Sequence, residues 1–220
     1  METDVAQLVI RTEIEGVYRY FLARRTRDGY WEWIGGKREG GETIQETAER
    51  ELKEEIQVDW GKYGFEIQGV AEHYPSEADS SYLLNPVLIE VEKAVFNKVS
   101  ESDLSNEHDK FEWIKLTEYD KFETLGQYKA LERLDLVEGD VALAVVENEG
   151  EYLIVERSEE NTSSGEWGFV SGKMEENETS DETAERELWE ETNLEAEPVE
   201  TGDFYIGKGE LGYWRLFPVL

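Results

Sequence analysis

Three glutamates in one short stretch have the residue type and spacing to hold a metal ion. Glu54 lies three residues after Glu51, and Glu55 lies four residues after it. A helix would therefore place all three on one face. Carboxylates this close repel each other, and a stable helix that keeps them therefore suggests a countercharge. Hard divalent cations prefer oxygen ligands, which indicates Mg²⁺ first and Mn²⁺ second.

The same pattern occurs a second time, 136 positions later (172 − 36 = 136). The pairs are Gly36 with Gly172, Glu42 with Glu178, Arg50 with Arg186, Glu51 with Glu187, Glu54 with Glu190 and Glu55 with Glu191. An acidic helix in an acidic protein is most often a solvated surface. Solvation alone does not explain why a glycine, an arginine and the glutamates recur together. The repeat therefore predicts a second carboxylate cluster, formed by Glu187, Glu190 and Glu191.

A helix that follows a glycine-containing loop must position each cluster. Thr43 with Glu46, and Thr179 with Glu182, have the spacing of a capping box, in which side chains satisfy the free N–H groups of the first turn. The apolar stripe that would dock the first helix on a sheet consists of Ala48, Leu52 and Ile56. The preceding glycines would let the backbone approach a phosphate or a metal closely.

These residues resemble the Nudix box, Gly-x5-Glu-x7-Arg-Glu-apolar-x-Glu-Glu-x-Gly-apolar. The first copy matches it at Gly36, Glu42, Arg50, Glu51, Leu52, Glu54, Glu55 and Val58, and the second at Gly172, Glu178, Arg186, Glu187, Leu188, Glu190, Glu191 and Leu194. Both copies depart at the last glycine, which is Gln57 in one and Asn193 in the other. That glycine ends the helix in a left-handed conformation, which Asn tolerates better than Gln.

The resemblance implies an α/β fold, a mixed sheet between helices in an αβα sandwich, here duplicated. We expect module 1 at residues 1–137 and module 2 at 138–220, with the second copy short at its C-terminal end. The predicted strands of module 1 are 8–11, 18–25, 30–34, 65–72, 82–91 and 111–116, with a loop at 100–110 and a closing helix at 125–134. In module 2 the last segment aligns through Pro218 with Pro86, and nothing follows that corresponds to the 111–116 strand or the closing helix.

The chemistry that the resemblance implies is hydrolysis of the pyrophosphate bond in a nucleoside diphosphate linked to another moiety. Glu51, Glu54 and Glu55 would hold Mg²⁺ or Mn²⁺, with a possible carbonyl ligand from Gly36, and Arg50 would orient the glutamates.

The general base has more than one candidate. A carboxylate outside the box is a common choice in the family, which points to Glu112, before a strand tryptophan; Glu54 or Glu51 comes next. Glu112 as an ordinary outward strand residue is an equal alternative. Because module 2 lacks a counterpart of Glu112, we expect module 1 to be the more competent site.

Composition limits the partners. The 220 residues carry 53 acidic and 22 basic side chains, a net charge of −31, and no cysteine. The acidic residues are spread evenly, as expected of a surface screened by molar salt in a halophile. Long nucleic acid is disfavoured because no basic patch offsets this field, and we expect a soluble, cytoplasmic protein with no membrane segment.

Two alternatives stay open at this stage. The protein could be a nucleotide-binding or sensing protein in which one or both modules bind without turnover, and the modules could pair with each other or with a second chain. The only histidines, His73 and His108, have no metal-ligand spacing, so we interpret both as loop or surface residues. Tyr74 falls where dinucleoside-polyphosphate hydrolases of the family often have a tyrosine, which is weak evidence for a substrate.

Overall fold

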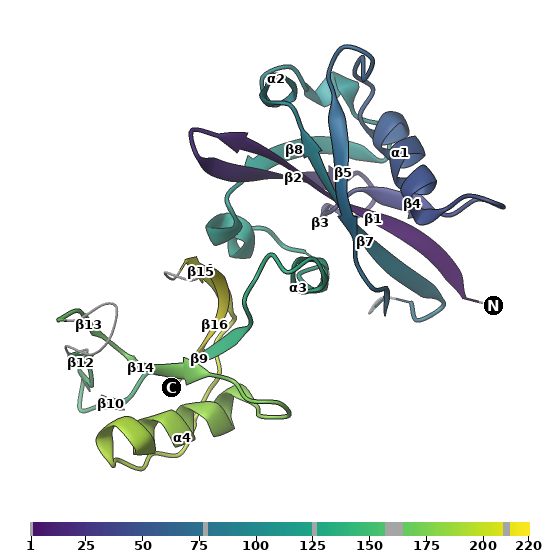
Figure 1. The fold of residues 1–220 in the computed structure, drawn as a ribbon. Coiled ribbons are helices and arrows are strands. Elements are labelled where there is room, and N and C mark those ends of the chain that lie inside the picture. Colours follow the sequence, from purple (N-terminus) through teal and green to yellow (C-terminus); the bar gives the residue numbers. More distant parts are fainter. Residues whose placement is uncertain (1, 77–78, 125–126, 157–164, 209–211) are drawn as a thin grey trace. The chain divides into compact units, whose positions relative to one another are not determined.

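The chain divides into two compact units, Met1–Leu136 and Val137–Leu220, here called module 1 and module 2. A computed structural model describes residues 2–76, 79–124, 127–156, 165–208 and 212–220. Each module builds a sheet of its own with a box helix packed on it (Figure 1). None of the described helices is long and apolar enough to cross a membrane.

Module 1 is a mixed sheet with helices. Its strands are β1 (Thr3–Ile14), β2 (Val17–Arg25), β3 (Trp31–Glu32), β4 (Gly35–Lys37), β5 (Phe65–Val70), β6 (Tyr74–Pro75), β7 (Tyr82–Val91) and β8 (His108–Ile114). Its helices are α1 (Ile44–Glu55), α2 (Lys93–Phe96) and α3 (Lys129–Arg133), with 3₁₀ turns η1 (Glu101–Asp103) and η2 (Leu116–Lys121). The strand order is β3-β2-β1-β7-β5, with β4 on β1, β6 on β7 and β8 on β2.

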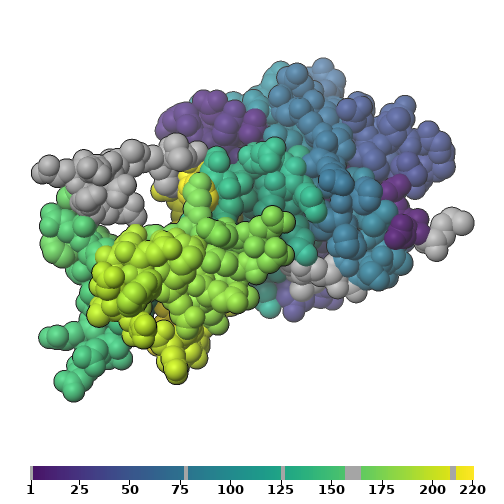
Figure 2. Space-filling view, turned by 60° about the horizontal axis from the view of Figure 1, so that its bottom comes forward, coloured from purple at the N-terminus to yellow at the C-terminus, as the bar shows by residue number. Residues whose placement is uncertain are grey.

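The central pair of the sheet, β1 and β7, is parallel, whereas its neighbours are antiparallel. Thr3 pairs with Tyr82, so the start of the chain lies beside the start of β7, as the neighbouring purple and blue-teal surfaces in Figure 2 show. This confirms the predicted mixed sheet.

The two faces of β1 serve different layers. Ala6, Leu8 and Ile10 alternate toward α1 and share a buried core with Ala48 and Leu52 of that helix. The other face of the sheet carries α3, which packs on β1 and β7 through buried Ala130 and Leu131. Helices therefore cover both faces (Figure 1), which confirms the αβα prediction.

Two predicted boundaries in module 1 were wrong. The expected loop at 100–110 contains η1 and the first three residues of β8, because polar Asp109 and Lys110 conceal a strand whose first residue, His108, is buried. Within the range of the expected helix at 125–134, the observed helix is the shorter α3, Lys129–Arg133. Residues 125 and 126 lie outside the described part of the chain.

Module 2 repeats the central part of this plan. Its elements are β9 (Asp140–Ala144), β10 (Glu147–Asn148), β11 (Glu151–Tyr152), β12 (Val155–Glu156), β13 (Trp167–Gly168), β14 (Val170–Lys173), α4 (Ser180–Thr192), β15 (Tyr205–Lys208) and β16 (Tyr213–Val219). The main sheet has the order β14-β9-β16-β15, with β16 parallel to β9.

The strand register supports the sequence alignment of the two modules. Pro86 of β7 pairs with Gln7 of β1, and Pro218 of β16 pairs with Leu143 of β9. Leu143 is the counterpart of Gln7 at the repeat offset (143 − 7 = 136). The two prolines therefore occupy equivalent places in the two sheets.

Candidate active site

Both box helices begin with the predicted capping box. Thr43 Oγ1 accepts from the N–H of Glu46 at 3.2 Å, and the N–H of Thr43 donates to Glu46 Oε2 at 2.8 Å. Thr179 and Glu182 make the same two bonds at 3.3 and 2.9 Å. These bonds satisfy N–H groups that the helix cannot, so each helix starts at a fixed point and its glutamates face a defined direction.

Arg50 joins the box residues of module 1 into one network. Its Nη1 donates to Glu51 at 2.7 Å and to Glu54 at 3.0 Å, and its Nε donates to Glu42 at 3.0 Å. Its Nη2 donates to the carbonyl of Lys37 in β4 at 2.9 Å. The guanidinium holds the pKa of Glu42 at about 2. The arginine thus ties the helix to the strand and orients two glutamates.

Module 2 repeats this network. Arg186 donates through Nε to Glu178 at 2.8 Å, through Nη1 to Glu187, and through Nη2 to the carbonyl of Lys173 at 3.0 Å. Glu190 lies 3.6 Å from the same guanidinium. The pKa of Glu178 is again about 2 because of its arginine partner.

A glycine makes room for the first glutamate in each module. A Cβ built on Gly36 would lie 2.1 Å from Glu51 Oε1, and one built on Gly172 would lie 1.9 Å from the Glu187 carboxyl carbon. Only glycine permits so close an approach. Burial raises the pKa of Glu51, and Arg50 partly opposes that effect.

Glu55 is held by a histidine that we interpreted wrongly from the sequence. His108 is not a loop or surface residue: it begins β8 and is 6% exposed. Its Nδ1 lies 2.9 Å from Glu55 Oε2 and its Nε2 lies 3.1 Å from Glu32 Oε1. Ser105 Oγ also donates to Glu55 Oε2 at 2.6 Å. Ser105 and His108 were missed as partners of Glu55 because they lie far from the box in sequence. Glu32 lies close to the box but was missed because no motif singles it out.

A β-bulge explains how the polar segment reaches the helix. The pairing of β2 with β8 shifts between Arg24 and Arg25, so His108 pairs with Arg25 while Lys110 pairs with Arg24. The extra residue, Asp109, changes which side chains face α1. Without that bulge, strand alternation would point His108 away from Glu55.

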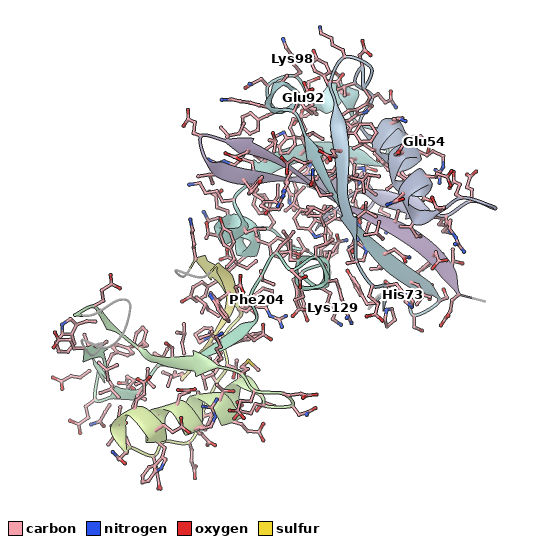
Figure 3. All side chains as sticks on the ribbon, viewed as in Figure 1. Glu54, His73, Glu92, Lys98, Lys129 and Phe204 are labelled. Carbon is pink, nitrogen blue, oxygen red and sulfur yellow. The ribbon has the colours of Figure 1, made fainter. Side chains whose placement is uncertain are left out.

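The same alternation separates Glu112 from the cluster. Phe111 and Trp113 pack on the core that α1 closes, so Glu112 between them points to the other face of the sheet, where it is exposed. Glu54 projects outward from α1 with 59% of its side chain exposed (Figure 3). His73, also exposed, lies well away from Glu54 in the same view.

In module 2, the third box glutamate has a different environment. Glu191 is exposed, whereas its counterpart Glu55 is 6% exposed. The two clusters thus share their arginine network but differ in how the third carboxylate is held.

The donor chemistry of the cluster fits a hard divalent cation. Glu51 and Glu55 are nearly buried carboxylates on one helix, and buried acidic groups need a counterion or hydrogen bonds. Among the described residues, however, no three acidic or histidine side chains are gathered as a ready-made cage. Arg50 instead neutralises Glu51 and Glu54. A bound cation would have to share these glutamates with the arginine.

Each module has a cavity beside its sheet. One in module 1, of about 300 Å³, has Gln7, Trp33, Gly35, Tyr74 and Gln127 in its walls. Gly35 directly precedes Gly36 of the box, but Gly35 pairs with Gln7 and Gly36 pairs with Ala6, and these two residues of β1 face opposite sides of the sheet. Tyr74 is 3% exposed and donates to Gln7 rather than presenting its ring face to solvent.

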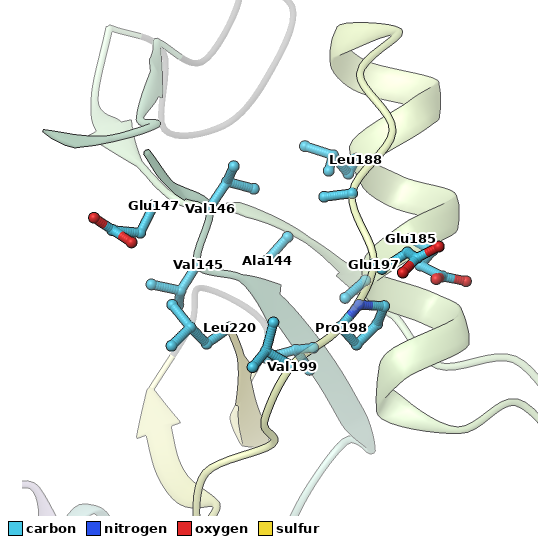
Figure 4. A pocket seen from close by; sticks show the side chains of 13 residues that line it. Ala144, Val145, Val146, Glu147, Glu185, Leu188, Glu197, Pro198, Val199 and Leu220 are labelled. Atoms are coloured by element: carbon cyan, nitrogen blue, oxygen red, sulfur yellow. The ribbon is translucent and has the colours of Figure 1, made fainter. Parts of the chain in front are cut away.

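The other cavity, of about 260 Å³, lies in module 2 between α4 and the end of β16 (Figure 4). Its walls include Ala144, Leu188, Val199 and Leu220. Some of the lining residues lie on α4, the helix that carries Arg186, but none of them is a member of the Arg186 network. The module 1 counterparts of Ala144 and Leu188 are Leu8 and Leu52, which are fully buried in the core. This cavity therefore corresponds to core space, not to a catalytic site.

The chain is similar in fold to several solved structures. An Ap4A hydrolase from C. elegans is 19% identical, with a TM-score of 0.47 over 61% of this chain and 97% of that one. A MutT protein from Methanosarcina mazei is 25% identical, with a TM-score of 0.43 over 61% and 93%. The E. coli dihydroneopterin triphosphate pyrophosphohydrolase is 19% identical, with a TM-score of 0.43 over 60% and 95%.

No curated protein sequence matches the chain. The family model described as NUDIX domain matches it twice, at residues 3–134 and 138–214. Because these matches cover nearly the whole sequence, the chain belongs to the Nudix family.

Proposed function

We propose that module 1 hydrolyses the pyrophosphate bond of a nucleoside diphosphate linked to another moiety. Family membership makes the protein a hydrolase of phosphorus-containing anhydrides that acts on small nucleotide derivatives. The observation that carries the proposal further is the network in which Arg50 holds Glu51 and Glu54 while His108 and Ser105 hold Glu55. A reaction that depends on the placement of charge requires carboxylates whose positions are fixed.

The box residues of module 1 have different proposed roles in the reaction. Glu51, Glu54 and Glu55, with the Gly36 carbonyl, are the proposed ligands of Mg²⁺ or Mn²⁺. Such a cation, when bound, neutralises phosphate charge and lowers the pKa of water. We assign the general base to Glu54 in preference to Glu112, because Glu54 is on the cluster and exposed whereas Glu112 faces the opposite side of the sheet.

Module 2 supports a second proposal, that of a nucleotide-binding module without turnover of its own. Its Arg186 network with Glu178, Glu187 and Glu190 is intact, which favours retained binding of a cation and phosphate. Its third glutamate, Glu191, is exposed, which favours a carboxylate less fixed in position than Glu55 of module 1. Pairing of the modules, or of two chains, belongs to the same proposal.

The surroundings of the protein are also part of the proposal. A net charge of −31 over 220 residues self-repels in dilute salt, so we propose a cytoplasm rich in salt, as in a halophile, as its setting. The same charge disfavours long nucleic acid as a partner.

The test is an assay of a panel of nucleoside diphosphate derivatives with Mg²⁺, with Mn²⁺ and with a chelator, each in dilute and in molar KCl. We expect a nucleoside monophosphate among the products, turnover only with a divalent cation, and higher turnover in molar KCl. If folded protein turns over no member of the panel under any of these conditions, the hydrolase proposal fails and nucleotide binding replaces it.

A further inference from the structure

Module 2 has two adjoining hollows beside α4. The first is the apolar cavity of about 260 Å³ (Figure 4). The second is a more open hollow with Trp189 of α4 in its wall. Glu185, Ala196 and Glu197 belong to the walls of both, so we treat the two hollows as one surface, called the α4 surface. In Figure 4, Glu185 and Glu197 lie at the edge of the cavity, on its α4 side.

The cavity lies where module 2 has smaller side chains than module 1. Ala144 stands where module 1 has Leu8, and Val146 stands where it has Ile10 (144 − 8 = 136, 146 − 10 = 136). Leu8 and Ile10 are buried in the core of module 1, whereas Ala144 and Val146 line the cavity. An apolar cavity of about 150 Å³ is large enough to hold a benzene ring. The larger cavity of module 2 therefore has room for one apolar side chain.

The same face of α4 lacks a lysine that α1 has. In α1, Lys53 lies 3.7 Å from Glu49, one turn away, and its ammonium lies over the ring of Phe65. The counterparts of Lys53 and Glu49 on α4 are Trp189 and Glu185 (189 − 53 = 136, 185 − 49 = 136). Trp189 is 49% exposed, and Glu185 has no ion-pair partner among the described residues. The helix keeps the carboxylate but has a tryptophan in the place of its countercharge.

The charge of module 2 selects the kind of partner that fits this surface. Residues 137–220 hold 23 acidic and 5 basic side chains, so module 2 carries −18 of the net charge of −31 (5 − 23 = −18). Arg186 is the one basic residue described in the walls of the hollows, and it already donates to Glu178 and Glu187. A second copy of the chain would bring the same acidic face, and the phosphates of a nucleic acid or a lipid would also be repelled.

We propose that the α4 surface binds a basic segment of a partner protein, in which an apolar side chain lies next to a Lys or Arg. The apolar side chain enters the cavity, and the cation lies over the ring of Trp189, beside Glu185 and Glu197. Cations are attracted to the face of a tryptophan ring and to carboxylates. A solvated acidic surface is the simpler interpretation of the glutamates, but it explains neither the half-exposed tryptophan nor the open apolar cavity.

The test titrates the full chain with three short synthetic peptides. One contains leucine and lysine, one serine and lysine, and one leucine and glutamate. Calorimetry in molar KCl measures binding, because salt at that concentration screens attraction at long range. We expect the leucine–lysine peptide to bind about tenfold or more tighter than either of the others, since it alone has both an apolar side chain and a cation.

Two variants restore residues of module 1 to the α4 surface. Ala144→Leu fills the cavity and should weaken binding of the leucine–lysine peptide about tenfold or more. Trp189→Lys restores the lysine beside Glu185 and should weaken binding by about 3- to 30-fold. Trp167→Lys is the matched control, because Trp167 is 62% exposed, lies outside both hollows and undergoes the same change of charge. Thermal unfolding verifies the fold of each variant, and Trp189→Lys alone decides the test if Ala144→Leu does not fold.

The variants separate this surface from the general charge of the protein. Equal weakening by Trp189→Lys and Trp167→Lys would show that only net charge attracts the peptide, and would overturn the proposal. The proposal also fails if wild type binds the three peptides equally, binds none of them, or prefers the leucine–glutamate peptide. A folded Ala144→Leu variant with unchanged affinity would equally contradict it. None of these results depends on turnover, so the proposed hydrolase is tested separately.

Discussion

His108 Nδ1 lies 2.9 Å from Glu55 Oε2, although 53 positions separate the two residues in the chain. The contact fixes the first residue of β8 against the last turn of α1. Because the other ring nitrogen lies 3.1 Å from Glu32, and a neutral imidazole has only one N–H, the two carboxylates favour the doubly protonated ring. The cation sits where two acidic side chains would otherwise repel each other.

Removing this histidine should weaken metal binding rather than folding alone. We expect His108→Gln to lower the affinity of module 1 for Mn²⁺ by about 10- to 100-fold, because side chains that orient a metal ligand have effects of that size. Electron paramagnetic resonance of free Mn²⁺ during titration measures it. His73→Gln is the matched control, because His73 is exposed and far from the cluster. Equal Mn²⁺ affinity in wild type and His108→Gln would show that His108 does not position Glu55.

The same histidine should make stability depend on pH. Burial alone lowers the pKa of His108, but its bonds to Glu32 and Glu55 outweigh burial and raise it to about 9, from 6.5 in the unfolded chain. A raised folded pKa means that the stabilisation is complete below pH 6.5 and is lost as pH rises toward 9. The free energy of unfolding of wild type, measured in chelator, should therefore fall toward that of His108→Gln over this window. A constant difference between the two proteins from pH 6 to pH 9 would contradict this.

Arg50 should not be replaceable by lysine. Its guanidinium donates in three directions, to Glu42, to Glu51 with Glu54, and to the carbonyl of Lys37. A lysine ammonium has no planar fork with which to reproduce this set. We expect Arg50→Lys to lower kcat by about 100-fold, the effect of a small misplacement of catalytic groups. Arg186→Lys, the equivalent change in module 2, should lower it far less, and equal losses would show that both modules turn over substrate.

Leu52 should be among the residues whose loss destabilises module 1 most. It is fully buried and packs α1 on the sheet. Leu52→Ala should lower the free energy of unfolding by about 2 to 5 kcal/mol, because it removes buried methyl groups and leaves a cavity. Urea denaturation followed by tryptophan fluorescence measures the change, and Val199→Ala, at a position 82% exposed, is the control. A loss below about 1 kcal/mol at Leu52 would mean that the helix does not rely on this contact.

Local patterns in the sequence predicted the box helices well. The capping pairs Thr43 with Glu46 and Thr179 with Glu182 are present as expected, because a cap depends only on residues three apart. Asn193 adopts the predicted left-handed conformation with φ 55°. At the C-terminal end of α1, Ile56 is extended and the N–H of Gln57 donates to the carbonyl of Asp103 at 2.6 Å. Tertiary contacts therefore replace the missing glycine of the first box.

Long-range contacts were beyond prediction from the sequence. His108 reaches Glu55 only because a bulge at Asp109 changes the face that β8 presents, and a bulge leaves no periodic trace in a polar segment. Glu112 had the sequence position of a family acid, but its direction depends on strand alternation that only the register reveals. Gln127 lies in no motif, and its contacts with Trp33 and Gln7 could not be predicted from the sequence.

We propose that the carboxylates of module 1 carry out the hydrolysis. Its most direct test compares wild type with Glu54→Gln/Glu55→Gln and with Glu190→Gln/Glu191→Gln, on the best substrate of the panel with saturating Mg²⁺. We expect the first double variant to lose metal-dependent turnover and the second to keep most of it, with both variants folded. Turnover that survives the change at Glu54 and Glu55, or that disappears with the change at Glu190 and Glu191, would contradict the assignment to module 1.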